Sequence, residues 1–213
     1  MKSDNIIVNV NLWGTCIGKL SWDMEKHCSV FQFSNKYRNQ PFDICPLTHP
    51  KSRPLSSSFY GNQDSLYQGL PKFLADALPD RWGSCLLDQW LTDNNIRVTE
   101  SLPLLKLLYI GKRAMGALEF EPEYEQTAVL EDVDMSALSD LASRIYTDRN
   151  TATISRKESV TMKKLIFLGT SAGGMRPKAV IAYNKDTGEF RSGQVNLPEG
   201  FKHYIIKFKE SDD

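Results

Sequence analysis

Cysteine and histidine are scarce in this sequence, which has four cysteines and three histidines among 213 residues. No C-x-x-C pair is present and no histidine lies at metal spacing, so neither a zinc site nor a disulfide framework is expected. No apolar run approaches the roughly 18 residues of a membrane-spanning helix. The opening residues lead straight into a short strand-like run, without the pattern of a signal peptide. These absences predict a cytoplasmic protein with reduced thiols and no membrane partner.

The net charge of the chain is zero, because 26 basic residues balance 26 acidic ones. The whole molecule therefore has no field that would favour nucleic acid or an anionic membrane. The charges are nevertheless segregated, since Glu119 to Asp140 holds eight acidic residues and no basic one, whereas Thr151 to Lys178 holds six basic residues and one acidic. Two solvated faces of opposite sign and a functional basic patch are equally compatible with this pattern.

The basic block ends in a glycine-rich stretch, residues 169–178, with three glycines, two hydroxyl side chains and two cations. Glycines allow close approach of the backbone to a ligand, and successive N–H groups in such a turn form an anion-binding concavity. The stretch matches neither the Walker motif nor the dinucleotide fingerprint, and it leads into a strand as the phosphate-covering loop of kinases does. A nucleotide phosphate is the ligand this composition favours; an ordinary glycine-rich turn is the alternative.

A second candidate is Lys207, which lies inside the strand-like run Tyr204 to Phe208. An ammonium among apolar neighbours needs a partner, and kinases place a phosphate-binding lysine on a strand beyond their glycine-rich loop. Alternation puts Ile205 and Lys207 on one face of the strand. The alternative is an edge-strand lysine with its ammonium in water. The interval from Gly174 to Lys207 is longer than in ordinary protein kinases.

Catalytic residues of phosphoryl transfer are not found in the sequence. It contains no segment like the kinase H-R-D or D-F-G motifs, and no Ser-His-Asp, Cys-His or paired-carboxylate set stands out. We therefore assign no catalytic residue and no metal ligand. Ser171, inside the glycine-rich stretch, could donate to a phosphate or be phosphorylated itself, which would put negative charge where the ligand phosphates belong.

Hydrophobic periodicity predicts an α+β protein with a small antiparallel sheet, several helices and a second group of strands. Strands are expected at 5–11, 16–22, 29–34, 116–121, 179–183, 189–194 and 203–208, with a short piece at Ile44 to Leu47. Helices are expected at 72–78, from a cap at Asp80 to about 91, from 101 to 111, and from a cap at Asp134 to about 145. Residues 159–168 fit a helix or a strand. The predicted domains are 1–125, an acidic link with a helix at 126–150, and 151–213.

Four segments, in order, resemble the HipA family of serine/threonine kinase toxins from bacterial toxin–antitoxin pairs. The opening hairpin carries Trp13-Gly14 and the later segments read FLADALPDRWG (73–83), YIGKRAMGAL (109–118) and SAGGMRPKA (171–179), the last followed by YIIKF (204–208). The resemblance implies the family's N-terminal subdomain followed by the start of a kinase-like N-lobe.

The resemblance also implies a site. The glycine-rich stretch would cover the phosphates of ATP, with binding residues Ser171, Ala172, Gly173, Gly174, Met175, Arg176, Lys178 and Lys207. Ser171 would be an autophosphorylated serine whose modification ejects the loop. The partners would be a protein substrate and a HipB-like helix-turn-helix antitoxin, with DNA contacted only through that antitoxin, in a system linked to persistence.

Family members are about twice as long, and their catalytic and metal-binding aspartates are expected beyond residue 213. ATP and Mg2+ would thus be cofactors of the complete protein, and the chain by itself is expected to transfer no phosphate. The alternative function is a non-catalytic binding module that docks an antitoxin or a separate kinase half.

Overall fold

The structure is a computed structural model that describes residues 6–54, 58–93, 95–97, 101–122, 135–147, 158–168, 174, 176–193 and 197–208. The chain divides into two compact units. The first comprises Met1–Leu78 and Arg97–Tyr124, and the second comprises Pro79–Ile96 and Glu125–Asp213. The first domain expected from the sequence was one continuous segment, whereas the contacts place residues 79–96 with the second unit.

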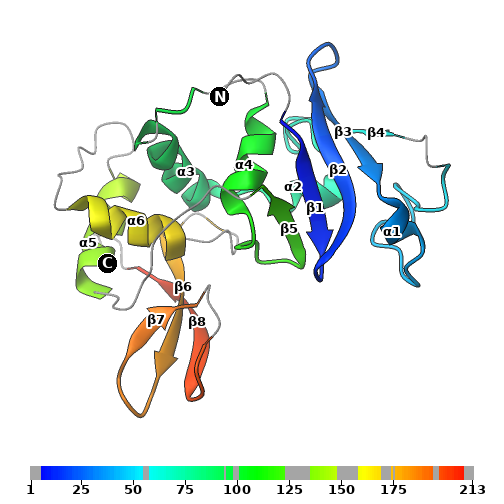
Figure 1. The fold of residues 1–213 in the computed structure, drawn as a ribbon. Helices are drawn as coiled ribbons and strands as arrows, with labels where there is room; N and C mark the ends of the chain where they lie inside the picture. Colours follow the sequence, from blue (N-terminus) through cyan, green and yellow to red (C-terminus); the bar gives the residue numbers. More distant parts are fainter. Residues whose placement is uncertain are drawn as a thin grey trace. The chain divides into compact units, whose positions relative to one another are not determined.

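The first unit is built on an antiparallel sheet with the strand order β4-β3-β2-β1-β5 in its described part (Figure 1). β1 pairs with both β2 and β5, so a strand from the second chain segment completes the sheet. The strands are β1 (Val8–Leu12), β2 (Thr15–Asp23), β3 (Cys28–Phe33), β4 (Phe59–Tyr60) and β5 (Leu118–Glu121). This sheet and its helices confirm the predicted α+β fold with a small antiparallel sheet.

The hairpin of β1 and β2 turns through two residues, Trp13 and Gly14. Their φ angles are 48° and 72°, and Leu12 pairs with Thr15 across the turn. Two positive φ angles are typical of the tight turn whose twist matches that of the flanking strands. The predicted hairpin is therefore confirmed at its turn as well as in its strands.

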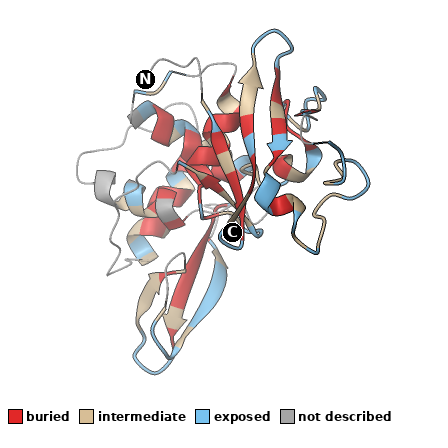
Figure 2. Ribbon diagram, turned by 45° about the vertical axis from the view of Figure 1, so that its right-hand side comes forward, coloured by how far each residue is buried: buried red, intermediate tan, exposed pale blue. Residues whose placement is uncertain are grey.

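The core of the first unit lies between the sheet and helices α2 (Lys72–Ala75) and α4 (Leu102–Ile110). Figure 2 shows buried residues along the central strands and over most of α4. The core side chains from the two helices are Leu74, Leu104, Leu107 and Leu108. α4 ends at Gly111, whose φ is 55° and whose N–H donates to the Leu107 carbonyl, as the sequence predicted.

The segment between β3 and β4 departs from the prediction in two ways. A short helix, α1 (Asn35–Arg38), forms because the Ser34 side chain accepts a hydrogen bond from the Tyr37 N–H. The predicted strand at Ile44 to Leu47 is wrong, because these residues form bends and turns. The carboxylate of Asp43 accepts from the N–H of Cys45 and of Lys51, so a side chain replaces a strand partner there.

The second unit combines three helices with an antiparallel sheet of order β7-β6-β8 in its described residues. The helices are α3 (Arg81–Asp93), α5 (Met135–Thr147) and α6 (Glu158–Leu168), and the strands are β6 (Lys178–Asn184), β7 (Phe190–Ser192) and β8 (Phe201–Lys207). All three strands predicted after the glycine-rich stretch are confirmed. The ambiguous residues 159–168 are helical. The predicted cap Asp134 lies outside the described residues.

Apolar faces predicted for α3 and α5 are buried. α3 contacts α5 and α6, and α6 contacts β6. The buried side chains of the unit include Trp82, Leu86, Leu87, Leu138, Leu141, Ile145, Leu165 and Ile181. No helix within the described ranges is long and apolar enough to cross a membrane.

Candidate functional site

The eight predicted binding residues fall into two groups. Ser171, Ala172, Gly173 and Met175 lie outside the described residues. The structure does place the other four, which are Gly174, Arg176, Lys178 and Lys207, and all four belong to the second unit. The geometry of the candidate site therefore rests on the exit of the glycine-rich stretch and on the sheet that follows it.

Gly174 is exposed and has a φ of +100°. A side chain there would be strained, so this position requires glycine for its backbone conformation. Space is not the reason, because the nearest atom to an added Cβ would be the Lys178 Nζ at 3.8 Å. Two residues later Arg176 is exposed, and Pro177 is then buried at the start of the sheet.

Lys178 opens β6, and its side chain is only 2% exposed. Its Nζ lies 2.9 Å from Oδ2 of Asp80 and 3.2 Å from the carbonyl oxygen of Gly174, to which it donates. The ammonium thus joins a carboxylate to the backbone of the glycine-rich stretch. A buried charge needs such partners, because an unpaired ammonium away from water is strongly unfavourable.

Asp80 uses its two carboxylate oxygens for two different tasks. Oδ1 accepts a hydrogen bond from the N–H of Gly83 at 2.8 Å, which confirms the predicted cap of α3. Oδ2 binds Lys178, and the Asp80 side chain is 13% exposed. The first turn of α3 is therefore tied directly to the first residue of β6.

Trp82 makes a second tie between the same two elements. Its indole Nε1 donates to the main-chain carbonyl of Lys178 at 2.9 Å, and its side chain is fully buried. Asp80 and Trp82 thus hold Lys178 by its side chain and by its backbone. Both come from the segment read as LPDRWG, whereas the sequence predicted a helix cap for one and a core position for the other.

Lys207 lies on β8, directly opposite Lys178 in the antiparallel register. Residues directly opposite each other in such a pair share a face of the sheet. The next residue fixes the strand end, since the Phe208 N–H donates to the Pro177 carbonyl at 3.0 Å. The second lysine is therefore held at the point where the glycine-rich stretch enters the sheet.

The two lysines lie in different environments. The argument that a strand lysine needs a buried partner applies to Lys178, whereas Lys207 is exposed on an edge strand of the described sheet, as in the alternative that the sequence left open. Exposure alternates only at the end of β8, where Ile205 and Lys207 are exposed and Phe208 is buried, because residues 202–205 are all exposed. The informative signal was the apolar run after Lys178, which makes β6 buried along nearly its whole length.

Within the described residues, this corner of the second unit carries positive charge that faces solvent. Lys207 on β8 and Arg176 before β6 are both exposed there. The charge of Lys178 is buried and is matched by Asp80. A glycine with positive φ and an exposed lysine are both groups that suit an anion with several oxygens.

One cluster in the first unit was not foreseen from the sequence. His49 Nδ1 lies 2.8 Å from the Thr48 hydroxyl and 3.7 Å from the Cys45 Sγ. Its ring contacts Phe59 and Phe73, with centroids 4.8 Å and 5.4 Å away. Burial lowers the pKa of His49, and the charge of Arg53 lowers it further. No group of three metal-binding side chains occurs among the residues that the structure covers.

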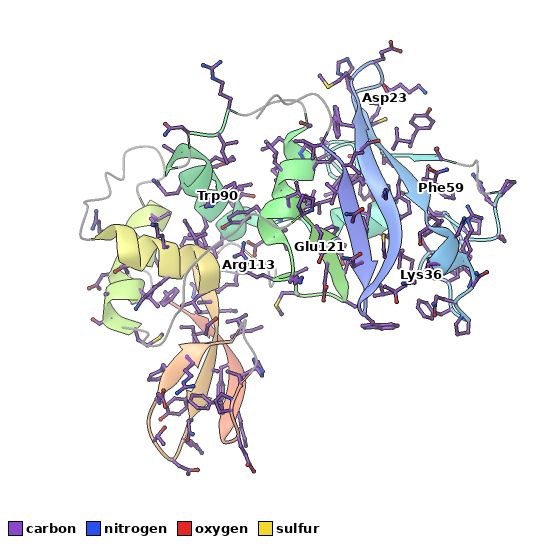
Figure 3. The ribbon with its side chains drawn as sticks, viewed as in Figure 1. Asp23, Lys36, Phe59, Trp90, Arg113 and Glu121 are labelled. Carbon is purple, nitrogen blue, oxygen red and sulfur yellow. The ribbon has the colours of Figure 1, made fainter. Side chains whose placement is uncertain are left out.

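The segment 109–118 has a structural role at the end of α4. The Arg113 guanidinium donates to the Tyr109 carbonyl and lies 4.9 Å from the centre of its ring. Burial raises the pKa of Tyr109 to about 12. Lys112 pairs with Glu121 of β5 at 3.5 Å, and Figure 3 shows Arg113 just past α4 and Glu121 on β5. The Lys112–Glu121 pair connects the end of α4 to the edge of the first sheet.

Comparison with protein families identifies the N-terminal part of the chain. Residues 8–121, more than half of the chain, match the family described as HipA N-terminal domain. The match includes the hairpin, the LPDRWG segment and residues 109–118, and it ends before the glycine-rich stretch. A search of curated proteins found no match. With its sheet, its helices and these three segments in order, the chain belongs to the HipA family.

Proposed function

We propose that the chain is the N-terminal part of a HipA-type toxin, a serine/threonine protein kinase that transfers phosphate from ATP to a protein hydroxyl. The observation that carries the proposal is the position of Lys207, directly opposite Lys178 where the glycine-rich stretch enters β6. In this proposal the second unit supplies nucleotide binding. Backbone N–H groups of residues 171–176 and the Lys207 ammonium hold the phosphates.

The different environments of Lys178 and Lys207 support the assignment of Lys207 as the phosphate-binding lysine. The Lys178 ammonium is committed to Asp80 and the Gly174 carbonyl, and it is nearly inaccessible to solvent. The exposed lysine on the same face of the sheet is Lys207. ATP supplies the phosphoryl group, and Mg2+ bridges its phosphates in kinases generally. The role of the described residues is to bind and orient those phosphates.

Catalysis itself is not assigned to any residue of this chain. Phosphoryl transfer requires a base near the acceptor hydroxyl and carboxylate ligands for the metal. We place those aspartates beyond residue 213, in accordance with the family resemblance, and we expect residues 1–213 alone to transfer no phosphate. Autophosphorylation of Ser171 would then switch binding off, because a phosphate there repels the phosphates of the nucleotide.

The proposed partners follow from family membership. We propose a HipB-like helix-turn-helix antitoxin as the binding partner, with DNA reached only through it, and a protein as the substrate. The match that supports this covers residues 8–121. The alternative, a binding module without use for ATP, makes the same partner prediction for the first unit but none for Lys207.

The test is nucleotide affinity in a matched pair of variants. Binding of a fluorescent ATP analogue with Mg2+ is measured for the wild type, Lys207→Met and Lys202→Met, both of which remove an exposed lysine from β8. Loss of a charge-assisted phosphate contact in Lys207→Met is expected to weaken binding by about tenfold or more. Lys202→Met is expected to bind as the wild type does. Equal affinities in all three proteins would favour the binding module.

A further inference from the structure

We propose that Asp80 is a positioning residue for the glycine-rich stretch and acts through Lys178. The inference rests on the proposed nucleotide-binding function of that stretch. Asp80 and Lys178 form a buried ion pair, here called the Asp80–Lys178 pair, with 2.9 Å between Oδ2 and Nζ. Its role is to fix the Gly174 peptide at the point where the glycine-rich stretch enters the sheet.

The contacts form a continuous path from a helix to the loop. Helix α3 begins at Arg81, and Asp80 caps it through Oδ1. Oδ2 of the same carboxylate holds the Lys178 ammonium, which in turn donates to the Gly174 carbonyl at 3.2 Å. Each link is a directional contact between defined atoms. The orientation of the Gly174 peptide is therefore set by the start of α3.

A hydrophobic pair would serve stability as well as this ion pair does. Replacing a buried ion pair with apolar residues of similar volume is often neutral or stabilising, so burial of two charges is not explained by stability alone. An apolar side chain at 178 could fill the space but could not donate to the Gly174 carbonyl. That donation is what the ammonium adds.

The two residues of the Asp80–Lys178 pair lie on different sides of the boundary of the family match. Asp80 lies inside the segment that matches the HipA N-terminal domain, whereas Lys178 lies outside it. Both nevertheless belong to the second unit, because residues 79–96 pack there. A residue of the matched domain segment thus contributes to positioning the nucleotide loop.

Three variants of the full chain separate positioning from stability. Asp80→Asn keeps an acceptor for the cap of α3 and removes the charge that holds Lys178. Lys178→Met keeps volume and removes the donor to Gly174. The double variant Asp80→Asn/Lys178→Met buries no unpaired charge. Glu189→Gln, which breaks a partly exposed pair with Arg191 in the same sheet, is the matched control.

Two quantities are measured for each variant. The first is hydrogen–deuterium exchange of the peptide that contains Gly174, without nucleotide. The second is affinity for the fluorescent ATP analogue with Mg2+. Asp80→Asn and the double variant are expected to exchange faster at this peptide and to bind about tenfold more weakly. The double variant is expected to regain thermal stability without regaining either property, and the control is expected to match the wild type.

The outcomes separate this inference from the proposed function. Wild-type exchange and affinity in Asp80→Asn, or recovery of both in the double variant, would overturn the positioning role and leave nucleotide binding intact. Faster exchange in a protein that binds no ATP analogue even as wild type would uphold the positioning of the loop and overturn its proposed ligand. A larger loss of affinity in Lys178→Met than in the double variant, at equal exchange, would also contradict the inference.

Discussion

The Lys178 ammonium lies 2.9 Å from the Asp80 carboxylate, although 98 positions separate the two residues in the chain. The same carboxylate caps helix α3, and the same lysine opens strand β6. A helix start and a strand start are thereby fixed to each other by one ion pair. A single substitution at either residue consequently disturbs two elements.

Loss of the buried pair should be far more damaging than loss of an exposed pair. Asp80→Asn leaves the Lys178 ammonium without its counter-charge, and we expect a loss of about 3 kcal/mol in the free energy of unfolding of the second unit. In the Glu189–Arg191 pair the guanidinium nitrogen and the carboxylate oxygen lie 2.7 Å apart, but both side chains are about a third exposed. Glu189→Gln should therefore cost less than about 1 kcal/mol. Urea unfolding measures both, and equal losses would contradict the prediction.

Trp82→Phe tests the second tie to Lys178. The change removes the Nε1 donor that lies 2.9 Å from the Lys178 carbonyl and keeps an aromatic ring in the core. We expect a loss of about 1–3 kcal/mol, because a buried carbonyl loses its partner. The control is Trp13→Phe, at a side chain that is 72% exposed, where the change should stay within about 0.5 kcal/mol. A Trp82 variant as stable as this control would refute the role of the indole N–H.

Gly174→Ala tests the backbone conformation at the loop exit. Its φ of +100° is strained for any side chain, and we expect a cost of about 1–3 kcal/mol or a rearranged loop. Weaker binding of the ATP analogue should accompany that cost. Gly116→Ala is the control, since an added Cβ at Gly116 meets nothing within 4 Å and no positive φ is involved. Equal affinity and stability in both variants would contradict the requirement for glycine.

The lowered pKa of His49 leads us to expect that the first unit loses stability in acid. Burial, with a smaller effect of Arg53, lowers the pKa of His49 from its ordinary value of 6.5. The unfolded chain therefore binds a proton that the folded one resists, so this stability is present above pH 6.5 and is lost as pH falls through the folded pKa. In His49→Gln the loss of stability between pH 7 and pH 5 should be shallower than in the wild type.

Urea unfolding at several pH values checks this. Above pH 7 the free energies of unfolding of the wild type and of His49→Gln should change with pH in the same way, because the imidazole is then neutral in both the folded and the unfolded wild type. Identical slopes below pH 6.5 would show that the His49 ring is not the group that titrates.

Features governed by nearby residues could be predicted from the sequence. The cap at Asp80, the end of α4 at Gly111 and the turn at Trp13 and Gly14 depend on contacts within a few positions, and all three are confirmed. Periodicity alone could not decide residues 159–168, because a short apolar run fits both a helix and a strand. Its packing against β6 and the other helices accompanies the helical form in the structure.

Features that depend on distant residues could not be predicted. The chain has 26 acidic residues, and nothing local indicates that Asp80 is the one that meets Lys178. The error at Ile44 to Leu47 has a different and local origin, since the side chain of the preceding Asp43 binds the loop backbone in place of a neighbouring strand. The binding roles of Ser171, Ala172, Gly173 and Met175 stay predictions.

The path of the chain has a consequence for synthesis on the ribosome. Helix α3 is made before its partners α5, α6 and β6, and the sheet of the first unit closes on β5 in between. At about 5–20 residues per second, the apolar face of α3, including Trp82, waits several seconds for the residues that bury it. During that interval α3 lacks its native partners from α5, α6 and β6, so the second unit cannot complete its core until β6 has been made.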